Sequence, residues 1–400
     1  MTYDFTTIMD RHGKDSIAAD VIPFEHYRVK EGFSRIPMWV ADMNFATAPS
    51  VVQAMEKRLK HPAFGYFPPS NEYNEAILRW HRERKGVSDL TADCIGYENG
   101  VLGGLVSAVN SLCAPGDYIL LHSPTYVGFT GSLENNGNRL ILSPLIKDEQ
   151  GIWRMDYEDM DRKLKQYSIH VAVFCSPHNP SGRVWERWEI EKAMEVYAAN
   201  NCYVISDEIW SDLILDGHTH IPTQSVSEDA KQRTIALYAP TKTFNLAGLI
   251  GSYHVIYNPW LRDRVHAVSS KPHYNSMNVL SMHALIGAYS DEGMAWTDEL
   301  CSVISRNVDY AYNYILTHFD GVTLAKPQGT YMLYLDCTKW CETHQTSIDD
   351  LQKAGVEVGV IWQDGRPFHH PCSIRMNLAL PYDLMVEAFE RLNHYVFNAD

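Results

Sequence analysis

The chain has 400 residues, 45% of them hydrophobic, and a formal net charge of −15 at pH 7. This length exceeds what one hydrophobic core usually holds, so we expect two globular domains. The acidic balance argues against a nucleic-acid partner or an anionic membrane, and no apolar run reaches the ~20 residues that a membrane helix needs.

The cysteines and histidines predict no metal site. The eight cysteines are dispersed without a CxxC pair, the 18 histidines lack HExxH spacing, and His369–His370 is typical of a loop. Dispersed thiols indicate a reducing compartment. The N-terminus is polar with mixed charge, unlike a signal peptide, so we expect a cytoplasmic protein.

Short apolar runs alternate with helical segments over much of the chain. Pro49 opens a segment with an apolar stripe at helical spacing, and a second stripe, Ile190 to Tyr197, separates two of the runs. The runs rich in β-forming residues are 117–123, 139–145, 170–176, 202–206, 234–238 and 250–256. Most are continuously apolar, as in strands buried on both faces, which predicts an α/β fold with a largely parallel sheet.

The last third of the chain has a different pattern. TYMLYLD (330–336) and SIRMNLA (373–379) predict strands of a separate, smaller sheet, and a stripe from Leu384 to Val396 predicts a C-terminal helix. We therefore expect a large domain over 49–285, a small α+β domain over 286–400, and an N-terminal segment, 1–48, that joins the small domain.

Polar or aromatic residues follow four of the predicted strands. Tyr126 follows 117–123, and Asn179 follows 170–176. Asp207 comes directly after 202–206, and Lys242 lies in the APTK that follows 234–238. Ligands of open α/β sheets bind beyond the carboxyl ends of the strands, so we expect these side chains to converge on one crevice.

This set of residues suits pyridoxal 5′-phosphate. The cofactor needs a lysine for its Schiff base, here Lys242, and a carboxylate, here Asp207, that keeps its ring nitrogen protonated. Facing that cation, Asp207 would stay ionised. Asn179 could donate to the phenolic oxygen of the ring, and Tyr126 could stack on its face.

A candidate phosphate cradle lies in ENGVLGGLVSAVNSLCAPG (98–116). A helical stripe begins near Gly100, so the free N–H groups of Val101 and Leu102 would point at an anion. Thr241, beside the lysine, adds a hydroxyl donor.

In SIRMNLA, Arg375 alternates with apolar residues. With a strand period of two, Ile374, Met376 and Leu378 face a core and Arg375 points the other way. An arginine there could grip an α-carboxylate through two parallel hydrogen bonds, or it could simply face solvent.

SPHNPSG, ISDEIW, the TK of APTK, and IRMN, in this order, resemble fold-type I pyridoxal-phosphate enzymes of the class I/II aminotransferase group, over essentially the whole chain. DRHG (10–13), WVADMNFATAP (39–49), FGY (64–66), TKTFN (241–245) and GTYMLYLD (329–336) are similar to the cystathionine β-lyase and cystalysin-like C–S lyases in that group. The resemblance implies the aspartate aminotransferase-like fold of PLP-dependent transferases.

The resemblance also implies a role for each candidate residue. Lys242 would form the Schiff base, and Asp207 would contact the pyridine nitrogen. The other implied cofactor contacts are Gly100, Val101, Leu102, Tyr126, Asn179, Trp210 and Thr241, and the implied substrate contacts are Arg375, Asn179 and Tyr126. It further implies a homodimer in which Tyr66 reaches the phosphate of the neighbouring subunit, and a small amino acid as substrate.

Four positions depart from the aminotransferase pattern. Trp210 stands near the C3 oxygen, where aminotransferases usually have Tyr and these lyases often have His. Ala239 replaces a hydroxyl residue, no Arg follows Lys242 by seven or eight residues, and Asn44 replaces an Asp. These differences favour the lyase branch.

The leading hypothesis is β-elimination from cystathionine or another S-substituted L-cysteine, giving a thiol, pyruvate and ammonia. An aminotransferase would use the same residues, with racemisation as a side reaction. A non-catalytic regulator on an enzyme fold is a third hypothesis, which the joint presence of Lys242, Asp207, Asn179 and Arg375 disfavours. A nicotinamide dehydrogenase is disfavoured because no GxGxxG opens a βα unit.

Overall fold

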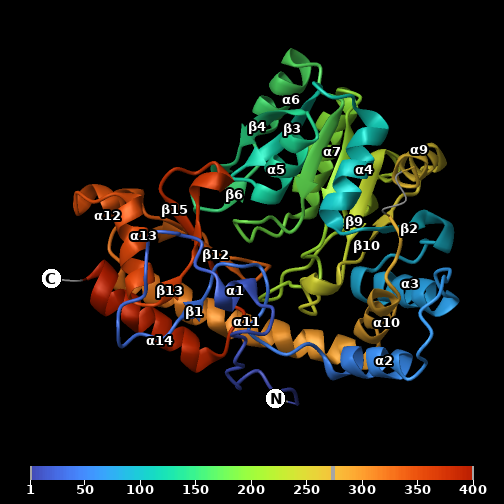
Figure 1. Ribbon diagram of the computed structural model, residues 1–400. Coiled ribbons are helices and arrows are strands. Elements are labelled where there is room, and N and C mark those ends of the chain that lie inside the picture. Colours follow the sequence, from blue (N-terminus) through green and yellow to red (C-terminus); the bar gives the residue numbers. More distant parts are fainter. Residues whose placement is uncertain (1, 272–274, 399–400) are drawn as a thin grey trace.

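The computed structural model describes residues 2–271 and 275–398, and its two main sheets lie in separate lobes (Figure 1). The larger sheet has seven strands in the order β2-β10-β9-β8-β7-β3-β4. Their bounds are β2 (Ile95–Glu98), β3 (Tyr118–Ser123), β4 (Arg139–Pro144), β7 (Val171–Cys175), β8 (Tyr203–Asp207), β9 (Thr234–Tyr238) and β10 (Ser252–Val255). All run parallel except β10, which is antiparallel to both of its neighbours.

The predicted strands of this sheet are confirmed, with two differences. The run 250–256 is shorter than expected and forms the single antiparallel strand, β10. Strand β2 was not predicted, because its IGYE sequence contains a glycine and a glutamate and lacks a strand-like pattern. Pairing with β10 supplies the stabilisation that local propensity does not.

Helices cover both faces of the larger sheet, which explains its continuously apolar strands. Along β3, Ile119 and Leu121 pack into one core and Leu120 into the other. Helices α4 (Val101–Leu112) and α5 (Val127–Asn135) bury apolar residues in the first core. Helices α6 (Tyr157–Gln166) and α7 (Arg187–Ala199) bury theirs in the second. The α/β fold is therefore confirmed.

The smaller sheet is antiparallel, in the order β11-β12-β15-β14. Its strands are β11 (Thr323–Leu324), β12 (Met332–Asp336), β14 (Gln363–Asp364) and β15 (Ser373–Asn377). Nearby, β1 (Ile36–Pro37) pairs in parallel with β13 (Val360–Ile361), so the N-terminal segment contacts the C-terminal part of the chain. The exact domain boundaries stay a prediction.

Further helices surround the two sheets. They are α1 (Ile17–Asp20), α2 (Pro49–Leu59), α3 (Asn71–Lys85), α8 (Glu228–Arg233), α9 (Pro259–Ser269), α10 (Val279–Ala288), α11 (Asp291–His318), α12 (Thr338–Thr343), α13 (Ile348–Glu357) and α14 (Tyr382–Leu392). The predicted C-terminal helix ends at Leu392, and Val396 lies in a π-helical turn that follows. The long α11 runs from beside α2 towards α14 (Figure 1). No helix in the described part of the chain combines the length and the apolar composition needed to cross a membrane.

Candidate active site

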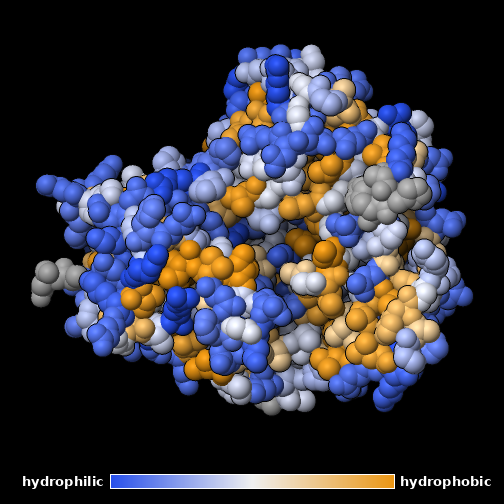
Figure 2. Space-filling model, in the orientation of Figure 1, coloured by the Kyte–Doolittle hydropathy of each residue, from blue (hydrophilic) through white to orange (hydrophobic). Residues whose placement is uncertain are grey.

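A cavity of about 260 Å³ lies at the carboxyl ends of the central strands. Tyr126, Asn179, Asp207, Trp210 and Lys242 all line it, although they come from four separate segments, each at the end of a strand or in the loop that follows it. Figure 2 shows the surface hollowed near the centre of the molecule, between the two lobes. The predicted convergence is therefore present, because parallel strands end at the same edge of the sheet.

Asp207 and Lys242 place opposite potential charges in this cavity. Asp207 ends β8, is 5% exposed, and accepts one backbone hydrogen bond from Ile209 at 3.0 Å. Burial raises the pKa of Asp207 to about 7. Lost hydration, helped by the charge of Arg375, lowers the pKa of Lys242 to about 8. Both groups can therefore change their proton occupancy near neutral pH.

The neighbouring carboxylate, Glu208, has the opposite environment. It is fully buried, which by itself would raise its pKa, but hydrogen bonds outweigh that effect and the pKa is lowered. His220 and the hydroxyl of Tyr238 each lie 2.7 Å from its Oε2, and the Thr223 amide donates to Oε1 at 3.0 Å. Glu208 follows Asp207, the last residue of β8, and contacts Tyr238, the last residue of β9, so it links the ends of these two strands.

The residues of the predicted anion cradle line the cavity. Gly100 precedes α4 with φ +79°, a conformation that glycine adopts without a Cβ clash. Val101 and Leu102 form the first turn of α4, where amide groups lack partners within the helix. Thr241 and Ile250 also line the cavity. Ile250, eight residues after Lys242, is an uncharged residue in this lining.

Arg375 lies on β15 and is 4% exposed, so the solvent-facing alternative is wrong. Its Nη1 donates to Asn179 Oδ1 at 3.1 Å, and its Nη2 donates to the Trp39 carbonyl at 3.1 Å. The guanidinium also lies over the Phe368 ring, 4.8 Å from its centroid. Its buried Nε has no hydrogen-bond partner among the described residues. The guanidinium thus keeps an unused donor.

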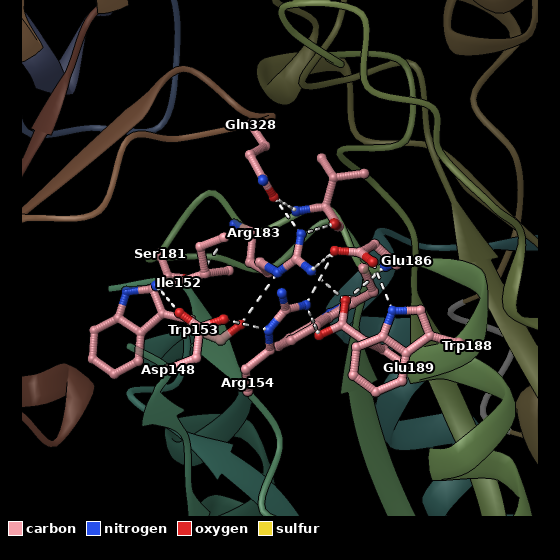
Figure 3. Close-up of polar contacts among 12 residues, drawn as sticks. Asp148, Ile152, Trp153, Arg154, Ser181, Arg183, Glu186, Trp188, Glu189 and Gln328 are labelled. Carbon is pink, nitrogen blue, oxygen red and sulfur yellow. Dashed lines mark hydrogen bonds and ion pairs between the residues drawn. The ribbon is translucent and has the colours of Figure 1, made fainter. Parts of the chain in front are cut away.

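A buried ion cluster supports the loop that carries Asn179 (Figure 3). Arg183 lies in the same loop, and its guanidinium donates to Glu189, to the side chain of Gln328 and to the Trp153 carbonyl. Gln328 lies between β11 and β12, so the cluster connects the large-sheet loop to the segment that leads into the smaller sheet. The guanidinium of Arg183 has five N–H donors in a rigid plane, so it can bond to several acceptors on the two segments at once.

Trp210 and Tyr66, both predicted to contact the cofactor, lie in different places. Trp210 lines the cavity and packs edge-on against Tyr331, with ring centroids 4.7 Å apart. Tyr66 does not line the cavity of its own chain, and its side chain is fully exposed in the loop between α2 and α3. Within one chain, then, Tyr66 stands apart from the other candidates.

Comparison with known proteins identifies the family and the fold of the chain. The family model of class I and II aminotransferases matches residues 36–392. The chain belongs to this family. Its fold is the predicted aspartate aminotransferase-like fold.

Among family relatives, the chain is similar to two curated bacterial proteins. It is 35% identical to cystathionine beta-lyase PatB of Bacillus subtilis over 75% of this chain and 77% of that protein. It is 29% identical to protein MalY of Escherichia coli over 89% of this chain and 88% of that protein. Among solved structures, cystalysin from Treponema denticola, which contains pyridoxal 5′-phosphate, superposes with a TM-score of 0.90 at 28% identity, covering 98% of both chains.

Two groups that line the cavity of this aminotransferase-family chain, the Cys175 thiol and the Ala41 carbonyl, were not predicted from the sequence. Cys175 lines the cavity beside Asp207, its partner in the sheet register. As the last residue of an apolar run, it resembled an ordinary core thiol. Ala41 lines the cavity as well, and its carbonyl accepts a hydrogen bond from Lys242 at 2.8 Å. No sequence signal marks a backbone carbonyl, because every residue has one.

Proposed function

We propose that the protein is a pyridoxal 5′-phosphate-dependent carbon–sulfur β-lyase that acts on cystathionine or related S-substituted L-cysteines. The names of PatB and cystalysin support the lyase branch. The observation that carries the proposal is one cavity lined by Lys242, Asp207 and Asn179, with the buried Arg375 hydrogen-bonded to Asn179. The overall reaction consumes one water and gives the thiol, pyruvate and ammonium.

The residues of the cavity fit this cofactor. Asp207 is a buried carboxylate with a raised pKa, and a cationic ring nitrogen beside it would supply the missing opposite charge. Lys242 would hold the cofactor covalently, and the amides at the start of α4, with Thr241, would bind its phosphate. Asn179 and Trp210 would donate hydrogen bonds to the ring oxygen, and Tyr126 would cover the ring face.

Arg375 would bind the α-carboxylate of the substrate. Its unpartnered Nε and its planar guanidinium suit a bidentate contact. The same arginine contacts Asn179, so substrate and cofactor would share one hydrogen-bonded frame. Burial of the pair excludes water and strengthens both contacts.

Lys242 would move the proton. When bound, the cofactor serves as an electron sink for the bond that breaks at the substrate Cα. The Nζ of Lys242, with its pKa lowered to about 8, is partly neutral near physiological pH and can accept the Cα proton. The same amine can then return a proton to the departing sulfur.

The proposal extends to a homodimer that shares its active sites. Tyr66 is fully exposed, and Leu59 and Phe64 beside it are 51% and 54% exposed. Figure 2 shows apolar surface over the neighbouring α2 and α10. A second copy covering this face would bury these side chains and could bring Tyr66 to the phosphate of its partner.

A cytoplasmic location is part of the same proposal. All eight cysteines are free thiols, and Cys337 and Cys341 are buried in the smaller lobe. Thiols persist in this state in a reducing compartment.

The direct test is incubation of the purified holoenzyme with cystathionine and with an S-alkyl cysteine. We expect stoichiometric release of keto acid and thiol, and none from the Lys242→Ala variant. Transfer of the amino group to an added keto acid, without thiol release, would favour the aminotransferase hypothesis. Absence of both reactions would contradict the enzymatic proposal.

A further inference from the structure

Residues 38–43, here called the strap, cross the site between the two lobes, and every backbone carbonyl in the strap accepts a hydrogen bond. The donors are Asn377 N to Met38, Arg375 Nη2 to Trp39, Asn377 Nδ2 to Val40 and Asp42, Lys242 Nζ and the Tyr331 hydroxyl to Ala41, and Asn245 Nδ2 and Arg11 Nη1 to Met43. The strap is therefore held from the large-sheet side and from the smaller sheet at once.

The Ala41 carbonyl lies at the centre of the strap and holds the Lys242 amine. The Nζ–O distance is 2.8 Å, and the Tyr331 hydroxyl donates to the same oxygen at 3.1 Å. A lysine that must accept a proton from a substrate carbon has to be free of the cofactor at that moment, and its amine then needs a fixed position. Ala41 supplies the acceptor that this free amine requires.

Asn245 holds the strap beside that contact. Its side chain accepts from the Met43 amide at 2.9 Å and donates to the carbonyls of Met43 at 2.9 Å and Phe45 at 3.1 Å. The residue lies three positions after Lys242 and has φ +57°, a left-handed conformation that asparagine tolerates better than most residues. One short turn therefore contacts the strap at both ends, through Lys242 and through Asn245.

We propose that Asn245 is a positioning residue that keeps the Ala41 carbonyl against the Lys242 amine and so aligns that amine for proton transfer. The inference rests on the proposed function, because it gives Lys242 the role of proton acceptor. It assigns Asn245 no contact with substrate or cofactor. Its effect is therefore on the rate of proton transfer rather than on binding.

The first test measures the strap itself in the holoenzyme. Asn245→Gly removes all three side-chain hydrogen bonds and keeps a residue that accepts positive φ. Asn201→Gly is the matched control, because Asn201 also has positive φ, +51°, but lies exposed on the surface. Hydrogen–deuterium exchange of the peptide spanning 39–45 is expected to accelerate in Asn245→Gly and to match wild type in Asn201→Gly. Unchanged strap exchange in Asn245→Gly would overturn the proposal.

The second test measures proton transfer without elimination. L-Alanine has no β-leaving group, so exchange of its Cα proton in D2O, followed by proton NMR, reports proton transfer at Cα without the elimination step. At saturating L-alanine we expect the exchange rate of Asn245→Gly to fall by about 10- to 100-fold, with the half-saturating concentration within about twofold of wild type, since small misplacement of a reacting group affects the rate most.

A second variant tests whether the side-chain amide group of Asn245 holds the strap. Asn245→Asp keeps the size of the side chain but turns oxygen towards the Met43 and Phe45 carbonyls, so it should slow Cα exchange at least as strongly. An unchanged exchange rate in both variants, or equal slowing in Asn201→Gly, would overturn the proposal. Because Cα exchange occurs in lyases and aminotransferases alike, failure of lyase activity would leave this test intact.

Discussion

The two walls of the active site are built in different ways. The large-sheet wall presents side chains at strand ends, with Asp207 and Lys242 among them. The second wall contains the Ala41 carbonyl of the strap, and Arg375 holds the strap through the Trp39 carbonyl. The first wall supplies groups that can gain or lose a proton, while the second supplies fixed positions for them.

The reactive groups and the contacts that hold them in position therefore come from separate parts of the chain. A change on the large-sheet wall should remove a reaction step, whereas a change on the strap wall should misplace a group that remains present. Kinetic constants distinguish these changes: loss of the chemical group should nearly abolish kcat, misplacement of a group should lower kcat only partly, and loss of a binding contact should raise KM.

The largest effect is expected at Lys242. Lys242→Ala should lower kcat for keto-acid release by on the order of 10⁴-fold, because no other amine lines the cavity in the described part of the chain. Lys242→Arg keeps the positive charge but cannot accept a proton near pH 7, so it should be as inactive. If Lys242→Ala kept activity within about 10-fold of wild type, Lys242 would not be the general base, and the chemical role of the large-sheet wall would be contradicted.

A smaller effect is expected at Arg375, on the binding side. Arg375→Lys keeps the charge but loses the bidentate geometry, so KM should rise by roughly 10- to 100-fold with a smaller change in kcat. Arg366→Lys is the control, because Arg366 pairs with Asp364 and Asp349 away from the cavity. A kcat loss without a KM change would instead assign Arg375 to the chemical step.

The pH dependence of stability tests Asp207 in the cofactor-free protein. Its pKa is raised from 3.8 to about 7, so the folded state binds more protons than the unfolded state between these pH values, and stability falls as pH rises through this window. Asp207→Asn should remove this loss and raise the melting temperature at pH 8 by several degrees. Near pH 4 the two proteins should melt alike. Equal melting temperatures at pH 8 would contradict the raised pKa.

The smallest effect is expected at the junction in Figure 3. Gln328→Leu leaves an Arg183 donor without this acceptor and should cost ~1–3 kcal/mol of stability, seen as a lower melting temperature. KM should rise by less than about 10-fold, since Asn179 and Arg375 keep their own contact. Arg154→Gln alters the same cluster without touching Gln328, and its KM should stay at the wild-type value.

The amino-acid sequence determined much of the large-sheet wall. Apolar runs followed by Asn179, Asp207 and Lys242 predicted both the strands and the crevice, because parallel topology brings strand ends together by a general rule. The antiparallel direction of β10 and the existence of β2 did not follow, since pairing between distant segments decides them.

Tertiary structure alone decided the strap wall. Nothing local marks the Ala41 carbonyl as the acceptor for Lys242, 201 residues further along the chain, or Asn245 as the side chain that holds Met43. The burial of Arg375 likewise depends on Trp39 and Asn179 meeting it from two distant segments. The sequence specifies the chemistry of each side chain directly. Backbone carbonyls are the same in every residue, so only the tertiary structure determines which of them become part of the site.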